Sequence, residues 1–311
     1  MLNRTPLYEL RLADDQSWVI EPTGDTGEWV DEVARLLRLK PSSESGVRTI
    51  HVERLPYGDG DGEREHARLP RCGHPDAEGC ISRAKPLELR RHPLIPGVVC
   101  RLRKDRESHQ VKQQMRYALR PVYEETIRRG GLPLHAALVE RDGQVVLLVG
   151  RSGVGKSTAC RRLPQPWNAL GDDLALAVRT GEGRYAVHPF PTWSAVQVGS
   201  GERTWDVNRS VSLSAIFLLT QGAEDAVEGV GTGVAAVALN DAAVTILYTV
   251  HACSGSGSTS LLRDVFSNAA AMARCVPVYI LRLSLTGRFW EKIEEALEKG
   301  DSPHFRRAHG A

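Results

Sequence analysis

A glycine-rich loop in the middle of the chain has the residue types and spacing that hold a phosphate. The stretch GRSGVGKS fits the pattern G-x-x-x-x-G-K-[ST] at every specified position. Glycines let successive backbone N–H groups turn toward one anion, and the helix that follows adds its positive end. The lysine reaches the terminal phosphates and the serine hydroxyl binds Mg²⁺. The sequence therefore predicts a nucleotide site formed by Gly150, Arg151, Ser152, Gly153, Val154, Gly155, Lys156, Ser157 and Thr158.

Two adjacent carboxylates, Asp172 and Asp173, follow this loop after one short helical segment and NALG. Neighbouring carboxylates push their pKa values apart, which suits one as a metal ligand and the other as a proton acceptor. A helix cap or a turn is the alternative interpretation of such a pair. Behind a complete phosphate loop, chemistry is favoured, with one carboxylate facing Mg²⁺ beside Ser157 and the other facing the γ-phosphate. We assign Asp172 to the metal and Asp173 to the proton, and the exchanged assignment stays open.

His135 lies in LPLHAALV, just upstream of the strand that leads into the phosphate loop. A single histidine on a strand is more often a structural residue. Its position could instead bring it beside Asp172 or Asp173. The candidate catalytic residues are therefore His135, Lys156, Asp172 and Asp173.

Hydrophobic patterning predicts the elements that position these residues. LPLHAALVE and QVVLLVG indicate two strands of a hairpin closed at Asp142-Gly143, and residues 156–163 indicate the helix of the phosphate loop. Residues 108–129 predict a helix upstream of the hairpin. Downstream we expect the strands LALAV, RYAVHPF, SLSAIFLLT and VPVYILRLSL, and the helices TSLLRDVFSNAAAMARC and RFWEKIEEALEKG.

The N-terminal part predicts a small α+β unit. LYELRLA, SWVIEP and RTIHVERL alternate like half-buried strands, EWVDEVARLLRLK has a helical apolar stripe, and residues 56–84 indicate a surface loop. We predict an α/β chain with an N-terminal recognition domain (1–107), a P-loop catalytic domain (108–300) and a flexible tail (301–311).

Composition limits the partners and the compartment. The net charge is only +2, from 40 basic and 38 acidic residues, which gives no argument for nucleic acid or an anionic membrane. We expect no apolar run to reach the length of a spanning helix, and the N-terminus lacks a signal-peptide core. Six scattered cysteines indicate reduced thiols. We expect a cytoplasmic protein that binds neither nucleic acid nor membrane.

Two further clusters have competing interpretations. Cys72, His74 and Cys80 offer three zinc ligands, with His66 and His92 near in sequence. A structural zinc site needs four ligands at suitable spacing, so a surface loop is favoured. The stretch PTWS, residues 191–194, either walls an acceptor pocket or holds an ordinary core tryptophan in a turn.

The order L-H-A-A, hairpin, strand, G-x-S-G-x-G-K-S-T and D-D resembles the catalytic domain of bacterial HPr kinase/phosphorylases, which is akin to the PEP-carboxykinase-like P-loop fold. The similarity covers residues 132–178. It implies a mixed sheet with helices, ATP and Mg²⁺ as cofactors, and phosphate transfer to a serine hydroxyl. The residues it implies are His135, Lys156, Ser157, Asp172 and Asp173. That family adds a glutamate to the metal site, for which Glu202 and Asp206 are the candidates here.

Three other stretches, HPFPTWSAVQ, RTWDVNRSVSLSAIFLL and SLTGRFWEKIEEAL, resemble relatives of that kinase encoded beside peptide-modification genes. These relatives include lasso-peptide precursor kinases and the SynChlorMet cassette family. The N-terminal part does not resemble the HPr kinase N-terminal domain, so HPr itself is not the expected substrate. HPr kinases are hexamers, and a homo-oligomer is left open.

Three hypotheses follow. The first is a Mg-ATP kinase of a serine-type hydroxyl on a peptide or small protein, which the adjacent aspartates and the additional N-terminal domain favour. The second is a small-molecule kinase of the same fold, acting on a hydroxy or amino acid. The third is an accessory module that binds nucleotide without transferring phosphate.

Overall fold

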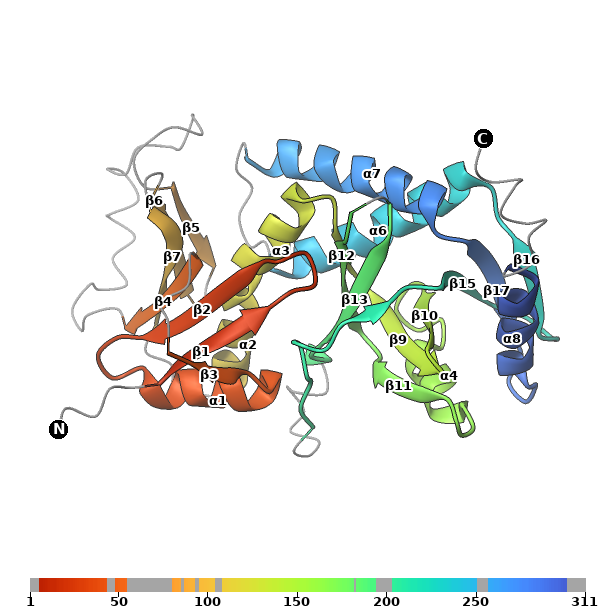
Figure 1. Ribbon diagram of the computed structural model, residues 1–311, viewed down its shortest axis with the longest axis horizontal. Coiled ribbons are helices and arrows are strands. Elements are labelled where there is room, and N and C mark those ends of the chain that lie inside the picture. Colours follow the sequence, from red (N-terminus) through yellow and green to blue (C-terminus); the bar gives the residue numbers. More distant parts are fainter. Residues whose placement is uncertain are drawn as a thin grey trace. The chain divides into compact units, whose positions relative to one another are not determined.

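The computed structural model describes residues 6–43, 48–54, 80–84, 87–92, 95–103, 108–181, 183–193, 203–250 and 257–300. The fold is mixed α/β, as predicted, with three sheets among these residues (Figure 1). Contacts group the chain into two compact units. The first comprises Met1–Glu125, Trp193–Asn208 and Tyr248–Leu261, and the second Thr126–Thr192, Arg209–Leu247 and Leu262–Ala311. The predicted recognition and catalytic domains stay predictions, because a contact pattern shows compactness and not a role.

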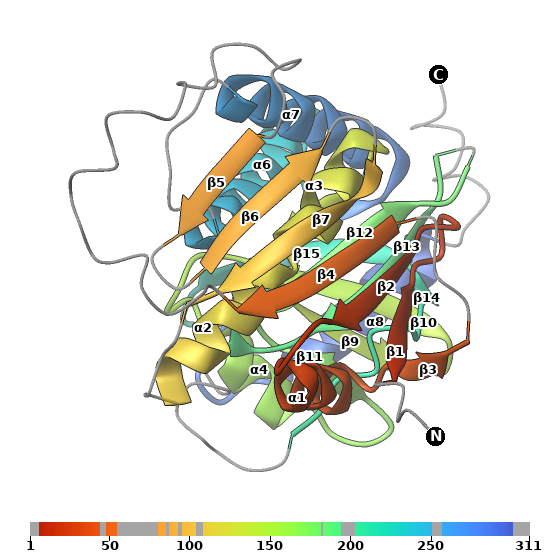
Figure 2. The ribbon, with the colours of Figure 1, turned by 90° about the vertical axis from the view of Figure 1, so that its left-hand side faces the viewer.

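The first unit contains a seven-stranded sheet in the order β3-β1-β2-β4-β7-β6-β5 (Figure 2). Strands β2, β4 and β7 are parallel, and the outer pairs are antiparallel. The strands are β1 (Leu7–Arg11), β2 (Ser17–Pro22), β3 (Lys40–Ser42), β4 (Arg48–Arg54), β5 (Cys80–Ala84), β6 (Leu87–His92) and β7 (Ile95–Leu102). The predicted loop is therefore wrong at its end, where Cys80–Ala84 pairs with β6.

Helix α1 (Gly27–Leu37) follows β2 in this unit, as its apolar stripe predicts. Trp29, Val33 and Leu37 are all buried on that stripe. The helix ends at Arg38, which adopts a left-handed φ of 51° and donates its N–H to carbonyls of the last turn.

The predicted helix over 108–129 is divided into α2 (Ser108–Ala118) and α3 (Arg120–Arg128). Pro121 explains the division. A proline has no N–H to donate to the preceding turn, and it is tolerated at the start of a helix but not in its interior.

The second unit contains a six-stranded sheet in the order β11-β9-β10-β15-β17-β16 (Figure 1). Its strands are β9 (Ala136–Arg141), β10 (Gln144–Val149), β11 (Asn168–Gly171), β15 (Ala215–Gln221), β16 (Ala226–Gly229) and β17 (Val278–Leu283). The predicted hairpin of β9 and β10 is confirmed, since Asp142 and Gly143 both have positive φ, at 49° and 81°. Two such residues form the two-residue turn that fits strand twist.

The described part of this unit also contains a smaller antiparallel sheet in the order β14-β13-β12-β8. Its members are β8 (Leu132–Leu134), β12 (Leu174–Arg179), β13 (Tyr185–Phe190) and β14 (Val211–Ser212). The single strand predicted for LPLHAALVE is thus wrong. The chain leaves one sheet at Leu134 and enters the other at Ala136, and the backbone N–H of His135, between them, bonds to the carbonyl of Ala242.

The predicted helices of the phosphate loop and the C-terminal part are present as α4 (Lys156–Arg162), α7 (Gly257–Cys275) and α8 (Phe289–Gly300). Side chains of α4 and α8 pack on one face of the six-stranded sheet, around a buried core that includes Ala159, Phe217 and Phe289. Burial of such aromatic and aliphatic side chains fixes the helix that follows the phosphate loop.

Helix α6 (Thr232–Val250) was not predicted. Its stretch Thr232–Thr249 is long and apolar enough to cross a membrane by length and composition, and 39% of it is buried. The expectation that no apolar run reaches spanning length is therefore wrong for this helix. The core helix of a globular domain passes the same test, so the finding is weak support for a membrane span.

Candidate functional site

The topology of the second unit brings the predicted site residues to one edge of the six-stranded sheet. Strands β10, β15 and β17 are parallel, and β11 also runs in their direction because both it and β10 are antiparallel to β9. The carboxyl ends of β10 and β11 therefore meet the amino end of β9 at this edge. Ligands of α/β sheets bind in this position, outside the carboxyl ends of parallel strands.

The phosphate loop follows β10 and depends on three of its glycines. Gly153 and Gly155 have φ of 80° and 114°, a region that L-residues with a Cβ rarely adopt. At Gly150, a Cβ would come within 2.7 Å of Val154 Cγ1. The loop backbone curls back on itself in a way that other residues at these positions would prevent.

Lys156 is the buried member of the loop, with 6% of its surface exposed. Its Nζ donates to the carbonyls of Gly150, at 2.6 Å, and Arg151, at 3.2 Å. Burial lowers the pKa of this ammonium group, while the negative charges of Asp173 and Asp172 oppose the shift. The lysine charge is therefore held by carbonyls of the loop itself, within electrostatic range of the two aspartates.

The other loop residues are open to solvent or half-buried. Arg151, Ser152, Ser157 and Thr158 are exposed. Ser157 lies in the first turn of α4, which begins at Lys156 after Gly155. This leaves the serine hydroxyl accessible at the mouth of the loop.

The two aspartates occupy the turn between β11 and β12 and have different partners. Asp173 Oδ1 lies 3.1 Å from His135 Nε2. Asp172 Oδ1 accepts a hydrogen bond from the hydroxyl of Thr192. The structure thus places His135 beside Asp173, one of the two positions considered for it, and joins both aspartates electrostatically to Lys156.

Sequence reasoning missed two residues at this edge. Thr192 was considered only as part of the stretch PTWS, in which Pro191, Thr192 and Trp193 are all buried and Ser194 lies outside the described residues. Gln221 ends β15, and its side-chain amide lies 3.4 Å from the carbonyls of Gly153 and Val154. The signal available in advance was position: Gln221 is the last residue of β15, and Thr192 lies two residues after β13.

The segment after β17 is tied to the phosphate-loop helix. Arg162, at the end of α4, donates to the carbonyls of Ser284, at 2.7 Å, and Gly287, and its guanidinium lies 5.2 Å from the ring centroid of Phe289. Asp225 accepts from the Ser284 N–H at 2.6 Å. The helix is therefore anchored at its C-terminal end as well as by its apolar face.

The oxygen groups beside the loop suit Mg²⁺ better than a metal held by protein ligands alone. No group of three or more His, Cys, Asp or Glu side chains that could hold an ion occurs within the described ranges. Mg²⁺ commonly binds through one or two carboxylates together with substrate phosphates, without a cage of protein ligands. The serine hydroxyl of Ser157 and the carboxylate of Asp172 fit that requirement.

Most of the other predicted metal ligands are not among the described residues. Glu202, Cys72, His74 and His66 are outside the described residues, as is the predicted tail, 301–311. Asp206 belongs to the first unit. The zinc alternative and the third carboxylate stay predictions.

More than half of the chain matches a known protein family. No curated protein matches the chain. Residues 98–298, more than half of the sequence, match the family described as SynChlorMet cassette protein ScmC. The chain belongs to this family. The predicted relationship to the SynChlorMet cassette is thereby confirmed.

The ScmC match begins within β7 and ends within α8. It therefore includes the phosphate loop, His135, both aspartates and Thr192. Strands β1 to β6 and α1 lie outside the matched residues, so what the ScmC proteins share is centred on the second unit.

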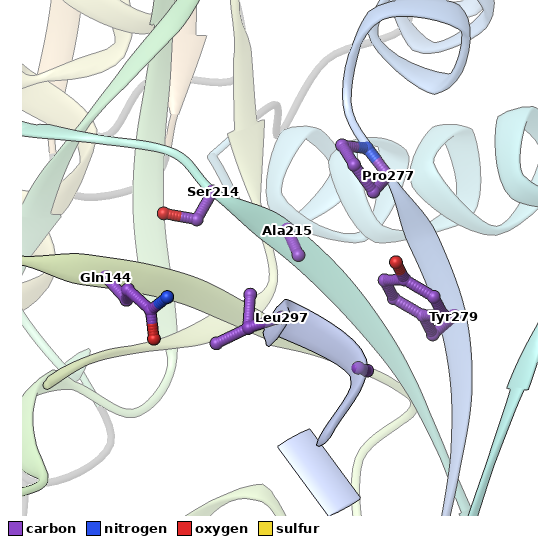
Figure 3. A pocket seen from close by; sticks show the side chains of 7 residues that line it. Gln144, Ser214, Ala215, Pro277, Tyr279 and Leu297 are labelled. Carbon is purple, nitrogen blue, oxygen red and sulfur yellow. The ribbon is translucent and has the colours of Figure 1, made fainter. Parts of the chain in front are cut away.

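A separate cavity of about 170 Å³ lies at the opposite edge of the six-stranded sheet in this ScmC-family chain. Figure 3 shows Gln144 and Ser214 on one side of it and Pro277 and Tyr279 on the other. These residues stand at the amino ends of β10, β15 and β17. The cavity is therefore distinct from the predicted phosphate site.

Proposed function

We propose that this ScmC-family protein is an ATP- and Mg²⁺-dependent phosphotransferase with an HPr kinase-like P-loop fold. It transfers the γ-phosphoryl group to a serine-type hydroxyl on a peptide or small protein. One observation carries the proposal: His135, Lys156 and the aspartate pair come from separate segments and gather at the sheet edge where the phosphate loop lies.

The loop residues account for nucleotide binding. Gly150 to Gly155 supply curled backbone N–H groups, and Lys156 supplies a charge for the β- and γ-phosphates. In the structure the Lys156 ammonium group donates hydrogen bonds to the carbonyls of Gly150 and Arg151. Phosphate oxygens are stronger acceptors for an ammonium group than neutral carbonyls, so binding replaces these contacts with better ones.

Ser157 and Asp172 would hold Mg²⁺. The ion supplies charge neutralisation of the phosphates when it is bound. Asp172 is suited to this role because it is fixed by a neutral hydroxyl, Thr192, which takes no part in proton exchange near neutral pH.

Asp173 would act as the base. The acceptor hydroxyl oxygen forms a bond to the γ-phosphorus, the bond from that phosphorus to the β,γ-bridging oxygen breaks, and the hydroxyl proton passes to Asp173. The products are a phosphoserine-type ester and ADP. His135, whose Nε2 is within hydrogen-bond distance of Asp173, orients the carboxylate and stabilises its charge.

The aspartate–histidine pair favours transfer over nucleotide binding alone. A binding module needs the loop and a metal ligand, but it has no use for a second carboxylate held by an imidazole. The membership in a peptide-cassette family and the additional N-terminal unit favour a peptide acceptor over a free metabolite. Among the described residues, Cys100, Cys160 and Cys275 are not part of a disulfide, in line with the cytoplasmic location that we propose.

The test is mass spectrometry of serine-containing peptides incubated with the purified protein and Mg-ATP. The peptides should include those encoded beside its gene, with free serine in parallel and Lys156→Ala as the control. We expect a phosphate added to peptide by the wild type only. Phosphorylation of free serine alone would replace the peptide kinase with a small-molecule kinase. Tight ATP binding without any transfer would support an accessory module.

A further inference from the structure

Thr192 is one of the few buried polar side chains in the described part of the second unit, with 5% of its surface exposed. It lies two residues beyond the end of β13, after Pro191. Its hydroxyl donates to Asp172 Oδ1. A buried hydroxyl requires a hydrogen-bond partner, and here that partner is a carboxylate of the proposed active site.

The pairing follows from strand register. In the β12–β13 ladder, Leu174 is opposite Phe190 and Ala175 is opposite Pro189. Continued by two residues, the same register sets Asp172 opposite Thr192. Directly opposed residues of an antiparallel pair have adjacent side chains on one face. The ladder that builds the small sheet therefore also brings this hydroxyl to this carboxylate.

Each aspartate thus has its own orienting group. His135, between β8 and β9, approaches Asp173, and Thr192, after β13, approaches Asp172. An imidazole can exchange a proton with its partner, whereas a hydroxyl donates a hydrogen bond without titrating. The imidazole therefore lies beside the aspartate proposed as the base, and the hydroxyl lies beside the aspartate proposed as the metal ligand.

We propose that Thr192 is a positioning residue that holds the Asp172 carboxylate in the orientation needed for Mg²⁺. This role rests on the proposed function. A carboxylate has about four acceptor sites, so one hydrogen bond at Oδ1 is compatible with metal ligation. Hydrogen bonds from outer groups to ligating carboxylates orient them, and their loss typically costs about 10–100-fold in metal affinity.

The test compares Thr192→Val, which keeps the side-chain shape but removes the hydroxyl, with Thr192→Ser, which keeps the hydroxyl. Mn²⁺ serves as the metal probe, and its binding to the complex with a non-hydrolysable ATP analogue is followed by electron paramagnetic resonance. Binding of the same analogue in EDTA is measured by calorimetry. Thr126→Val is the matched control, since Thr126 is a buried threonine of the second unit that belongs to α3, a helix that supplies none of the proposed site residues.

We expect Thr192→Val to weaken Mn²⁺ binding by about 10–100-fold with metal-free nucleotide binding unchanged. Thr192→Ser should restore most of the affinity, and Thr126→Val should match the wild type. Should Thr192→Val not fold, Thr192→Ala takes its place with the same expectation.

Two results would overturn the role of Thr192. One is unchanged Mn²⁺ affinity in the valine or alanine variant, and the other is an equal loss of metal-free nucleotide binding. Both are distinguishable from failure of the proposed function, in which the wild type itself binds neither the analogue nor Mn²⁺.

Discussion

His135 Nε2 and Asp173 Oδ1 lie 3.1 Å apart because the chain crosses between the same two sheets at both residues. His135 stands where the chain passes from β8, in the four-stranded sheet, to β9, in the six-stranded sheet. Asp172 and Asp173 stand where it passes back from β11 to β12. The two crossings are neighbours because β11 pairs with β9 and β12 pairs with β8.

Replacing the two aspartates one at a time should affect nucleotide binding and phosphate transfer separately. We expect Asp173→Asn to retain Mg-nucleotide binding while the rate of phosphate transfer falls by about 10²–10⁴-fold, as removal of a general base does. Asp172→Asn should weaken Mg-nucleotide binding instead. Calorimetry with the ATP analogue and phosphopeptide mass spectrometry measure the two quantities.

Asp142→Asn is the control for this pair, since Asp142 lies at the exposed hairpin turn and its φ of 49° suits asparagine. It should match the wild type in both assays. If Asp173→Asn abolished nucleotide binding while Asp172→Asn kept it, the metal and base roles would be exchanged.

When the protein binds nucleotide above neutral pH, Lys156 should take up a proton. Burial lowers the pKa of Lys156, so the free protein loses this charge at a lower pH than an ordinary lysine would. Bound phosphates stabilise the ammonium form and raise its pKa again. The free protein then gains a proton on binding, and the nucleotide affinity falls as the pH rises through the lowered pKa.

Calorimetry in buffers of different ionisation enthalpy measures this proton uptake. The measurement is made above the pH at which the nucleotide phosphates are fully ionised, so that they contribute no proton. Lys156→Arg is the control, because a guanidinium stays protonated throughout. Proton uptake that persisted in the arginine variant would assign the titration to another group.

Local signals in the sequence sufficed for the hairpin of β9 and β10 and for the helix that follows it. The glycine positions, the Asp142-Gly143 turn and the helix from Lys156 depend on residues close in sequence, and the structure has the hairpin and the helix where they were expected. The aspartate pair was visible for the same reason. The position of this pair at the loop depends on pairing between distant strands. The short distance in sequence between the pair and the loop was nevertheless sufficient to suggest that they lie together.

Features set by tertiary pairing could not be predicted. The break at His135 is hidden in LPLHAALVE, which is apolar on both sides of the histidine. The contact of Thr192 with Asp172 requires the β12–β13 register, which the sequence does not specify. Helix α6 escaped prediction because GVAAVALNDAAVTILYTV is apolar around most of the helix and so lacks an amphipathic period.

Gly155→Ala should abolish nucleotide binding and destabilise the protein. The φ of 114° at Gly155 lies outside the range that alanine adopts without strain, and such strain costs about 1–3 kcal/mol. Relief of the strain would rotate the backbone N–H groups of the loop away from the phosphates. Urea unfolding and calorimetry with the ATP analogue measure the two effects.

Gly181→Ala is the matched control for this substitution. Gly181 also has a positive φ, of 63°, with nothing within 4 Å of an added Cβ, but it lies in the turn after β12. It should lose about 1 kcal/mol of stability and bind nucleotide normally. Normal binding by Gly155→Ala would mean that the curled loop is not the phosphate site.

The fold of the first unit should depend on the carboxylate of Glu124. This residue is 5% exposed, and it accepts hydrogen bonds from Arg91 at 2.5 Å and from Arg120 at 2.6 Å. Glu124→Gln removes the counter-ion that Arg91 and Arg120 share. Because the Arg91 side chain is partly exposed, the loss should fall below the roughly 3–5 kcal/mol of a fully buried ion pair. Glu32→Gln, which removes an exposed partner of Arg35, should cost less than about 1 kcal/mol.

Hydrogen exchange locates the effect of Glu124→Gln, because a chain with two compact units need not unfold in one step. Amide protection should fall in β6 and β7 of the first unit and stay unchanged in β10 and β15 of the second. Nucleotide binding at the phosphate loop should then be retained. Equal loss of protection in both units would show instead that they unfold together, and the phosphate site would depend on the first unit for its stability.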